Sequence, residues 1–322
     1  MLRIEAQQEK RAIMSFADII KACTKTRIDN MKYREETANL FEVGGDVVSD
    51  PLKNALGTGF FRKAAPEADR SIGLHPSQLY GMCMRSKMFV ENLDLFEGIP
   101  GVNTPFEESI PASLQAKFDI GHSLHHWYQN KYLGPMGILK GGWKCPQCKS
   151  VEEGFRPAID CKNCGCDKWG FVEPFIQIPE LGIVGHCDGI IDHGDGPWVL
   201  DIKTIDPDRF KNLSEVSMSY VYQVHCYMLA LDIDRAVILY VDKSANYANP
   251  TKEFKIKKNN RIIRDIKKIS EYYNESRTNR VLPEIMCKNK TCTSAKRCAF
   301  RSVCFDEDIV SVFSEKWGNT NV

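Results

Sequence analysis

The stretch "GHCDGIIDHGDGPWVLDIKT", residues 185–204, sets two acidic residues inside apolar runs that are typical of β-strands. The runs are joined by a turn rich in Gly, Asp and Pro, which predicts two neighbouring strands. Asp188 and Asp201 would then project from adjacent strands to one point, because side chains alternate along a strand. The same alternation puts Lys203 on the face of Asp201 and turns Ile202 to the other face.

Two neighbouring carboxylates repel each other, and a buried carboxylate without a partner is costly. A divalent cation between Asp188 and Asp201 would remove that penalty, and oxygen ligands favour Mg²⁺ or Mn²⁺. Such a cation activates water and stabilises charge on a phosphate oxygen, while Lys203 would add a positive charge beside the attacked phosphorus. The alternative is a surface hairpin with exposed acids, which the Asp-x-Lys triplet alone favours, so agreement with distant segments decides between the two.

The composition is that of a folded protein with a sizeable core, with 43% hydrophobic and 26% charged residues in 322. No apolar run approaches the roughly 18 residues of a membrane span, and the N-terminus lacks the apolar centre of a secretory signal. We therefore expect a cytoplasmic protein with reduced thiols and no membrane partner. The net charge of +1 leaves a nucleic-acid partner to a local patch, such as the basic run 251–270, which is either a solvated helix face or a phosphate contact.

The distribution of apolar runs, glycines and cysteines divides the chain into five segments. They are a helical N-terminal region at 1–75, the first part of the core at 76–140, a Cys-rich insertion at 141–170, the rest of the core at 171–282, and a Cys-rich segment with a tail at 283–322. Apolar patterns predict helices after Pro76 and at about 111–132, 215–231 and 259–275, and strands within 171–203 and at 235–242. This order predicts an α/β core with a central mixed sheet.

Four short motifs follow one another along the chain. They are Gly121-x-x-x-His125, Gly185-x-x-Asp188, Asp201-x-Lys203-Thr204 and Gln223-x-x-x-Tyr227. This set resembles the core of the PD-(D/E)XK nucleases, and most closely the RecB-like exonuclease branch that includes the CRISPR-associated RecB-like exonucleases. The resemblance covers residues 76–305 and implies a restriction-endonuclease-like core, a mixed sheet flanked by helices.

The resemblance also implies a role for each motif residue. His125, Asp188 and Asp201 would ligate the metal together with the carbonyl of Ile202, and Lys203 would position and polarise the nucleophilic water. Two further residues on a downstream helix, Gln223 and Tyr227, would orient the metal site and the DNA strand. The neighbouring histidines at 122 and 126 compete with His125 for its assignment, which depends on the spacing from the motif glycine.

The insertion carries two Cys-x-x-Cys knuckles, Cys145 with Cys148 and Cys161 with Cys164, separated by 12 residues. This spacing is typical of a zinc ribbon, in which four thiolates hold one tetrahedral ion. Zinc would supply folding free energy of about 10 kcal/mol that so short a segment cannot gain from a core. Cys166 is a spare thiol, and the ribbon is either structural or in contact with DNA.

A second group of cysteines is split between Cys83 and the C-terminal residues Cys287, Cys292, Cys298 and Cys304. It resembles the cysteine arrangement of RecB-like nucleases with an iron–sulfur cluster, in which an early helix carries a pattern similar to Ser77, Leu79, Cys83 and Arg85. The resemblance implies a 4Fe-4S cluster held by Cys83, Cys292, Cys298 and Cys304, with Cys287 as the alternative to Cys292. The rival interpretation is a second zinc site.

These observations together predict a metal-dependent DNA exonuclease that hydrolyses phosphodiester bonds at single-stranded ends, in recombination, repair or phage DNA processing. Two alternatives stay open at this point. One is a structure-specific DNA endonuclease on the same core, because the motifs serve both activities. The other is a non-catalytic nucleic-acid-binding protein that uses its metal clusters as a scaffold.

Overall fold

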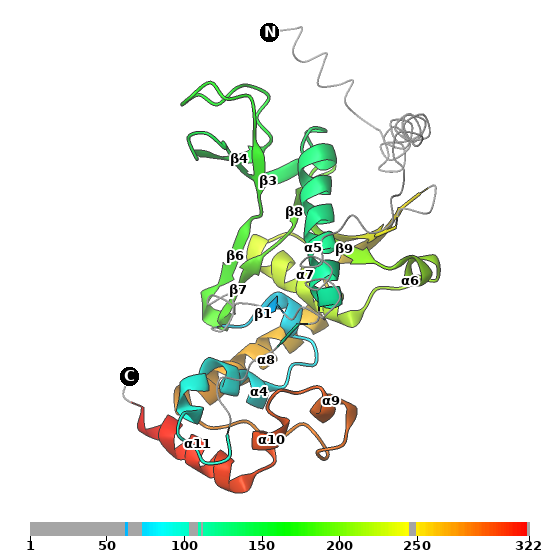
Figure 1. Cartoon of the computed structure of the whole chain (residues 1–322). Coiled ribbons are helices and arrows are strands. Elements are labelled where there is room, and N and C mark those ends of the chain that lie inside the picture. The colour runs from blue at the N-terminus through cyan, green and yellow to red at the C-terminus, as the bar shows by residue number, and fades with distance from the viewer. Residues whose placement is uncertain (1–61, 64–72, 103–108, 111, 245–248, 321–322) are drawn as a thin grey trace, which may run out of the picture.

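A computed structural model of the protein describes residues 62–63, 73–102, 109–110, 112–244 and 249–320 (Figure 1). Its helices are η3 (Pro76–Gln78), α4 (Met84–Glu91), η4 (Leu93–Phe96), α5 (Ala112–Trp127), η5 (Tyr128–Leu133), η6 (Pro179–Leu181), α6 (Pro207–Lys211), α7 (Met218–Leu231), α8 (Asn260–Asn279), α9 (Thr293–Lys296), α10 (Arg301–Cys304) and α11 (Glu307–Asn319). Its strands are β1 (Arg62–Lys63), β2 (Ser109–Ile110), β3 (Leu139–Lys144), β4 (Val151–Phe155), β5 (Gly170–Val172), β6 (Phe175–Ile178), β7 (Ile183–His186), β8 (Gly189–Ile191), β9 (Trp198–Ile205), β10 (Arg235–Asp242) and β11 (Thr251–Lys257).

The centre of the protein is a seven-stranded mixed sheet with the order β11-β10-β9-β8-β3-β4, in which β5 pairs with β3. Strands β9 and β10 are parallel, and every other neighbouring pair is antiparallel. The predicted mixed sheet flanked by helices is therefore confirmed. The parallel pair is joined through α6 and α7, which gives the chain the length that a parallel connection requires.

Side-chain alternation gives this sheet two buried faces, each with its own helices. On one face, Val199 and Ile238 belong to a large core together with residues of α7 such as Val224. On the other face, Leu200 and Ile202 belong to a second core with residues of η5. In β9, Asp201 consequently lies on the α7 face, while its neighbour Ile202 faces α5 and η5.

The chain leaves the main sheet after β5 and enters it again between β7 and β8. The sequence pattern predicts one continuous strand from residue 183 to residue 192, but β7 pairs with β6 in a separate two-stranded hairpin, and β8 pairs with β9 and β3. Asp188 lies in the break and not within a strand. The prediction of a single strand is therefore wrong, because the partner that draws β7 away is non-local and leaves no mark on the apolar run.

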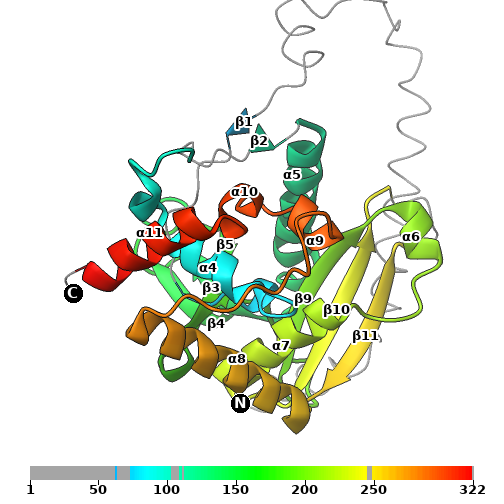
Figure 2. The ribbon, with the colours of Figure 1, turned by 90° about the horizontal axis from the view of Figure 1, so that it is seen from below.

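The C-terminal segment packs on the early helix α4, and Figure 2 shows α10 and α11 beside it. The contact contains an aromatic cluster in which Phe89 of α4 meets Phe300 at 5.3 Å and Phe313 at 4.9 Å between ring centroids. Arg85 donates a 2.6 Å hydrogen bond to the carbonyl of Pro283. Apolar packing therefore contributes to this closure, independently of any cluster that the nearby cysteines hold.

Three sequence predictions concern the N-terminal region, the segment after Pro76 and the basic run. The helical N-terminal region at 1–75 lies almost entirely outside the described residues, which there include only β1 and residues 73–75. The helix expected after Pro76 is divided into η3 and α4, and the first part of the basic run 251–270 is strand β11 and not helix. No helix in the described part of the chain has the length and apolar character needed to cross a membrane.

Candidate active site

Two glycines of the motifs allow close approach of the elements that carry the acidic and imidazole groups. A Cβ on Gly121 would lie 3.3 Å from the hydroxyl oxygen of Thr204, so glycine lets α5 lie close against β9. His125 follows one helical turn later and reaches Asp188, with 3.4 Å between Nδ1 and Oδ1. A Cβ on Gly185 would meet the ring of Pro76 at 3.0 Å, which keeps β7 close to η3.

Asp188 lies in the bend just before β8 begins. Its Oδ2 accepts a 2.5 Å hydrogen bond from the backbone amide of Ile202, and its Oδ1 faces His125. Burial would raise the pKa of Asp188, but the positive charges of His125 and Lys203 and the hydrogen bonds hold that pKa below its usual range. Burial would likewise lower the pKa of His125, and the carboxylate of Asp188 outweighs it, so the pKa of His125 is raised.

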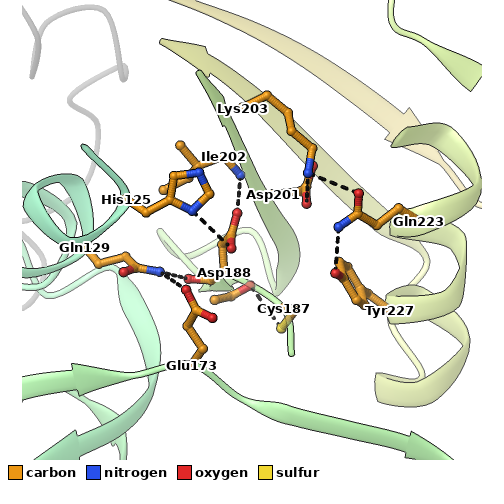
Figure 3. A network of polar contacts seen from close by, with 11 residues as sticks. His125, Gln129, Glu173, Cys187, Asp188, Asp201, Ile202, Lys203, Gln223 and Tyr227 are labelled. Atoms are coloured by element: carbon orange, nitrogen blue, oxygen red, sulfur yellow. Dashed lines mark hydrogen bonds and ion pairs between the residues drawn. The ribbon is translucent and has the colours of Figure 1, made fainter. Parts of the chain in front are cut away.

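A chain of polar contacts runs from β9 to α7 on the other side of the site, as Figure 3 shows. Lys203 Nζ donates to Asp201 Oδ1 and to Gln223 Oε1, both at 3.0 Å. Gln223 Nε2 donates in turn to the hydroxyl of Tyr227 at 2.8 Å. The Gln-x-x-x-Tyr motif thus spans one turn of α7 and holds the lysine that follows the acid.

Asp201 is 1% exposed and carries an oxygen with no hydrogen-bond donor in the described part of the chain, its Oδ2. Burial and the nearby Asp188 raise the pKa of Asp201 to about 6, although Lys203 opposes this. Burial would lower the pKa of Lys203, but the two carboxylates outweigh it and raise that pKa, so the ammonium is charged at neutral pH. A buried acceptor without a donor fits a cation that binds there.

Sequence reasoning missed two residues of this site, Glu173 and Gln129. The ligand atoms of His125, Glu173 and Asp188 all lie within 4.8 Å of one another, and Asp201 is not part of that group. Gln129 donates from Nε2 to Glu173 Oε1 at 3.0 Å and to the carbonyl of Asp188 at 2.9 Å. The position of Glu173 depends on the pairing of β6 with β7, which has no sequence signature, whereas Gln129 could have been noticed four residues after His125.

The four cysteines of the insertion lie together, two in the loop between β3 and β4 and two in the loop between β4 and β5. Figure 1 shows β3 and β4 as an arm that extends from the core. Cys145 Sγ lies 3.5 Å from Cys164 Sγ, and Cys148 Sγ lies 3.5 Å from Cys161 Sγ. Four ligands at 2.3 Å from one tetrahedral zinc ion would be about 3.8 Å apart, so the arrangement fits a single ion. Cys166, the spare thiol, contacts the carbonyl of Lys168 instead.

The second group of cysteines surrounds a pocket between α4 and the C-terminal segment. Cys83, Cys287, Cys298 and Cys304 line it together with Phe89 and Phe300. Cys292 is not among the lining residues and lies beside Cys287. Within the described residues these cysteines do not form a group with all sulfurs inside 4.8 Å.

One protein family matches a large part of the sequence. Residues 143–305 match the sequence profile of the PD-(D/E)XK nuclease superfamily. Similar solved structures are the alkaline exonuclease LHK-Exo from Laribacter hongkongensis (13% identity, TM-score 0.37), the same enzyme in complex with dAMP (14%, 0.39) and SSO0001 (15%, 0.36). In the same order, the matched regions span 64%, 64% and 72% of this chain. They span 88%, 88% and 84% of the chains of those three structures.

No curated protein matches the sequence. The family profile spans more than half of the 322 residues and includes Asp188, Asp201 and Lys203. The chain therefore belongs to the PD-(D/E)XK nuclease superfamily.

Proposed function

We propose that the protein is a metal-dependent DNA exonuclease that hydrolyses phosphodiester bonds at single-stranded ends. Membership of a nuclease superfamily whose members use divalent metals supports the hydrolysis of a nucleic acid. The observation that carries the proposal is the approach of His125 to Asp188 beside the Asp201–Lys203 pair, next to the start of β8.

The metal ligands in this proposal are His125, Asp188, Asp201 and the carbonyl of Ile202, with Glu173 as an additional ligand. The set fits Mg²⁺ or Mn²⁺ because carboxylate and carbonyl oxygens dominate it. When bound, the cation would polarise a phosphate oxygen and lower the pKa of a coordinated water. His125 can take part only through a neutral ring nitrogen, so the histidine loses its proton when the cation binds.

Lys203 places its charge where the attacked phosphate gains negative charge. The Gln223 carbonyl oxygen and the Asp201 carboxylate hold its ammonium at 3.0 Å each, so the lysine needs little reorganisation during the reaction. Tyr227 fixes the Gln223 amide through the 2.8 Å hydrogen bond to its hydroxyl oxygen. In this proposal Gln223 and Tyr227 are positioning residues for the lysine.

In this proposal the two cysteine groups are structural metal sites. Zinc held by Cys145, Cys148, Cys161 and Cys164 would stabilise the arm that β3 and β4 form. A 4Fe-4S cluster in the pocket beside α4 would join the early helix to the C-terminal segment, next to the aromatic contacts. The lining of the pocket favours Cys287 as the fourth ligand beside Cys83, Cys298 and Cys304.

The test compares linear and circular single-stranded DNA of one sequence, labelled and incubated with Mn²⁺. We expect nucleotide release from the linear substrate and none from the circle, because an exonuclease needs an end. Cleavage of the circle would instead support the endonuclease alternative. Asp188→Asn should abolish release, whereas Asp234→Asn, which changes an exposed acid paired with Lys258, should not. An Asp188→Asn protein with full activity would overturn the proposal.

A further inference from the structure

The β6–β7 hairpin adjoins the active site at the end that leads to Glu173 and Asp188. Phe175 pairs with His186 in its register, and the amide of Cys187 donates a 3.1 Å hydrogen bond to the carbonyl of Pro174, which continues the pairing toward the site. The carboxylates of Glu173 and Asp188, two residues further along the two segments, each have an oxygen within 4.8 Å of the other. Because two residues of chain span at most about 7 Å, the backbone of the aromatic pair lies within that distance of the backbone of the acidic pair.

The two faces of this hairpin differ sharply. Ile176 and Ile178 are buried in the core, as is Ile183 on the paired strand. Phe175 is 58% exposed, more than any other aromatic side chain in the described part of the chain. Its only described ring contact is with His186, edge to face, with centroids 5.3 Å apart and planes at 60°.

An exposed phenylalanine alone is ordinary on protein surfaces, and its position is what distinguishes this one. The acidic pair would hold the phosphate that is cleaved, so the base of an adjoining nucleotide comes within reach of a ring whose backbone lies at most about 7 Å away. Nucleobases stack on aromatic rings whatever their identity, and only an unpaired base has a free face to offer. A protein partner would have no comparable reason to cover a ring next to the carboxylates.

We propose that Phe175 and His186 form a stacking site for an unpaired nucleobase next to the cleaved phosphate. This inference rests on the proposed function and deepens it, because it assigns the preference for single strands to a named surface. Phe175 supplies the apolar ring, and His186 supports its edge and adds a second π-face. Binding energy from this site acts on strand affinity and not on metal affinity.

The experiment measures binding of a fluorescent single-stranded oligonucleotide by anisotropy, with Ca²⁺ in place of the active cation to suppress cleavage. Phe175→Ala should weaken binding about 5- to 150-fold, the factor expected for one stacked base. Phe175→Trp should bind at least as tightly as the wild type. Phe175→Leu should resemble the alanine variant, because leucine is apolar but cannot stack. Tyr272→Ala, which removes another exposed ring, on α8, is the matched control and should bind normally.

A series of oligonucleotides, each with one abasic position, makes the test specific. In the wild type one abasic position should weaken binding by the same factor as Phe175→Ala, and the variant should no longer respond to that position. Wild-type cleavage of single strands together with unchanged binding by Phe175→Ala would overturn the stacking site while the nuclease proposal stands. A wild-type protein that neither binds nor cleaves single strands would remove both proposals.

Discussion

The carboxylate of Asp188 is tied to the middle of the neighbouring strand by the 2.5 Å hydrogen bond from the amide of Ile202. The bond lies one step beyond the pairing of β8 with β9, which begins at Gly189 and Leu200. One oxygen of Asp188 is thus held by backbone, while the other stays directed at His125. The break between β7 and β8 thus places one carboxylate where it contacts both the imidazole of His125 and the backbone of β9.

Glu173→Gln tests whether the carboxylate that sequence reasoning missed is a metal ligand. The amide keeps the shape and can still accept the hydrogen bond from Gln129, but it loses the charge. We expect the affinity for Mn²⁺ to fall about 10- to 100-fold, measured by calorimetry or by the electron paramagnetic resonance of free Mn²⁺. Glu180→Gln, an exposed acid in η6, is the control. Equal Mn²⁺ affinity in the two variants would leave Glu173 without a ligand role.

Metal affinity should fall as the pH falls through about 6. Burial and the charge of Asp188 raise the pKa of Asp201 to about 6, and the carboxylate of Asp188 outweighs burial to raise the pKa of His125. Both groups bind protons below these pKa values, and each proton that the cation must displace lowers the affinity by up to about tenfold per pH unit. Calorimetry in buffers of different ionisation enthalpy counts the released protons. Asp201→Asn should release one fewer, and an affinity that is flat from pH 5 to 8 would contradict the prediction.

Cys287→Ser and Cys292→Ser form a matched pair that identifies the fourth thiolate. Because Cys287 lines the pocket and Cys292 does not, the first variant should lose iron and visible absorption after anaerobic purification. The second should retain about four irons per chain. The reverse result would assign Cys292, the residue that the sequence resemblance favours. Wild-type protein with zinc in place of iron would remove the cluster altogether.

Cys148→Ser should remove zinc from the arm, and Cys166→Ser should not, because only the former belongs to the group of four sulfurs. Loss of zinc should also lower the affinity of the active site for Mn²⁺ by about tenfold. The reason is that β5 follows the arm and leads directly into Glu173, so a change in the arm reaches this carboxylate. The amide of Phe171 in β5 donates a 2.7 Å hydrogen bond to the side-chain oxygen of Asn130. Zinc content by atomic absorption and Mn²⁺ affinity would be measured on the same samples. Retention of zinc by Cys148→Ser would contradict the assignment.

The sequence predicts the elements whose signals are local. The uninterrupted apolar run at 235–242 is strand β10 with those bounds, and alternation correctly places Asp201 and Lys203 on one face. The break after β7 was not predictable, because residues 183–192 read as one apolar strand and the separation depends on pairing with β6. Glu173 was missed for the same reason. Its role follows from a register between strands, which no spacing within the sequence encodes.

The wide turn η5 has a consequence for the length of the helix that carries His125. Gly134 donates to the carbonyl of Gln129, five residues earlier, so this turn holds one residue more than an α-helix would. Deleting one residue from 130 to 133 would let the segment close into ordinary α-helix while the turns on either side keep their orientation, because the extra residue is what widens this turn. A deletion between Gly121 and His125, where the helix is an ordinary α-helix, would instead turn the histidine by about 100° relative to the glycine that lies against β9.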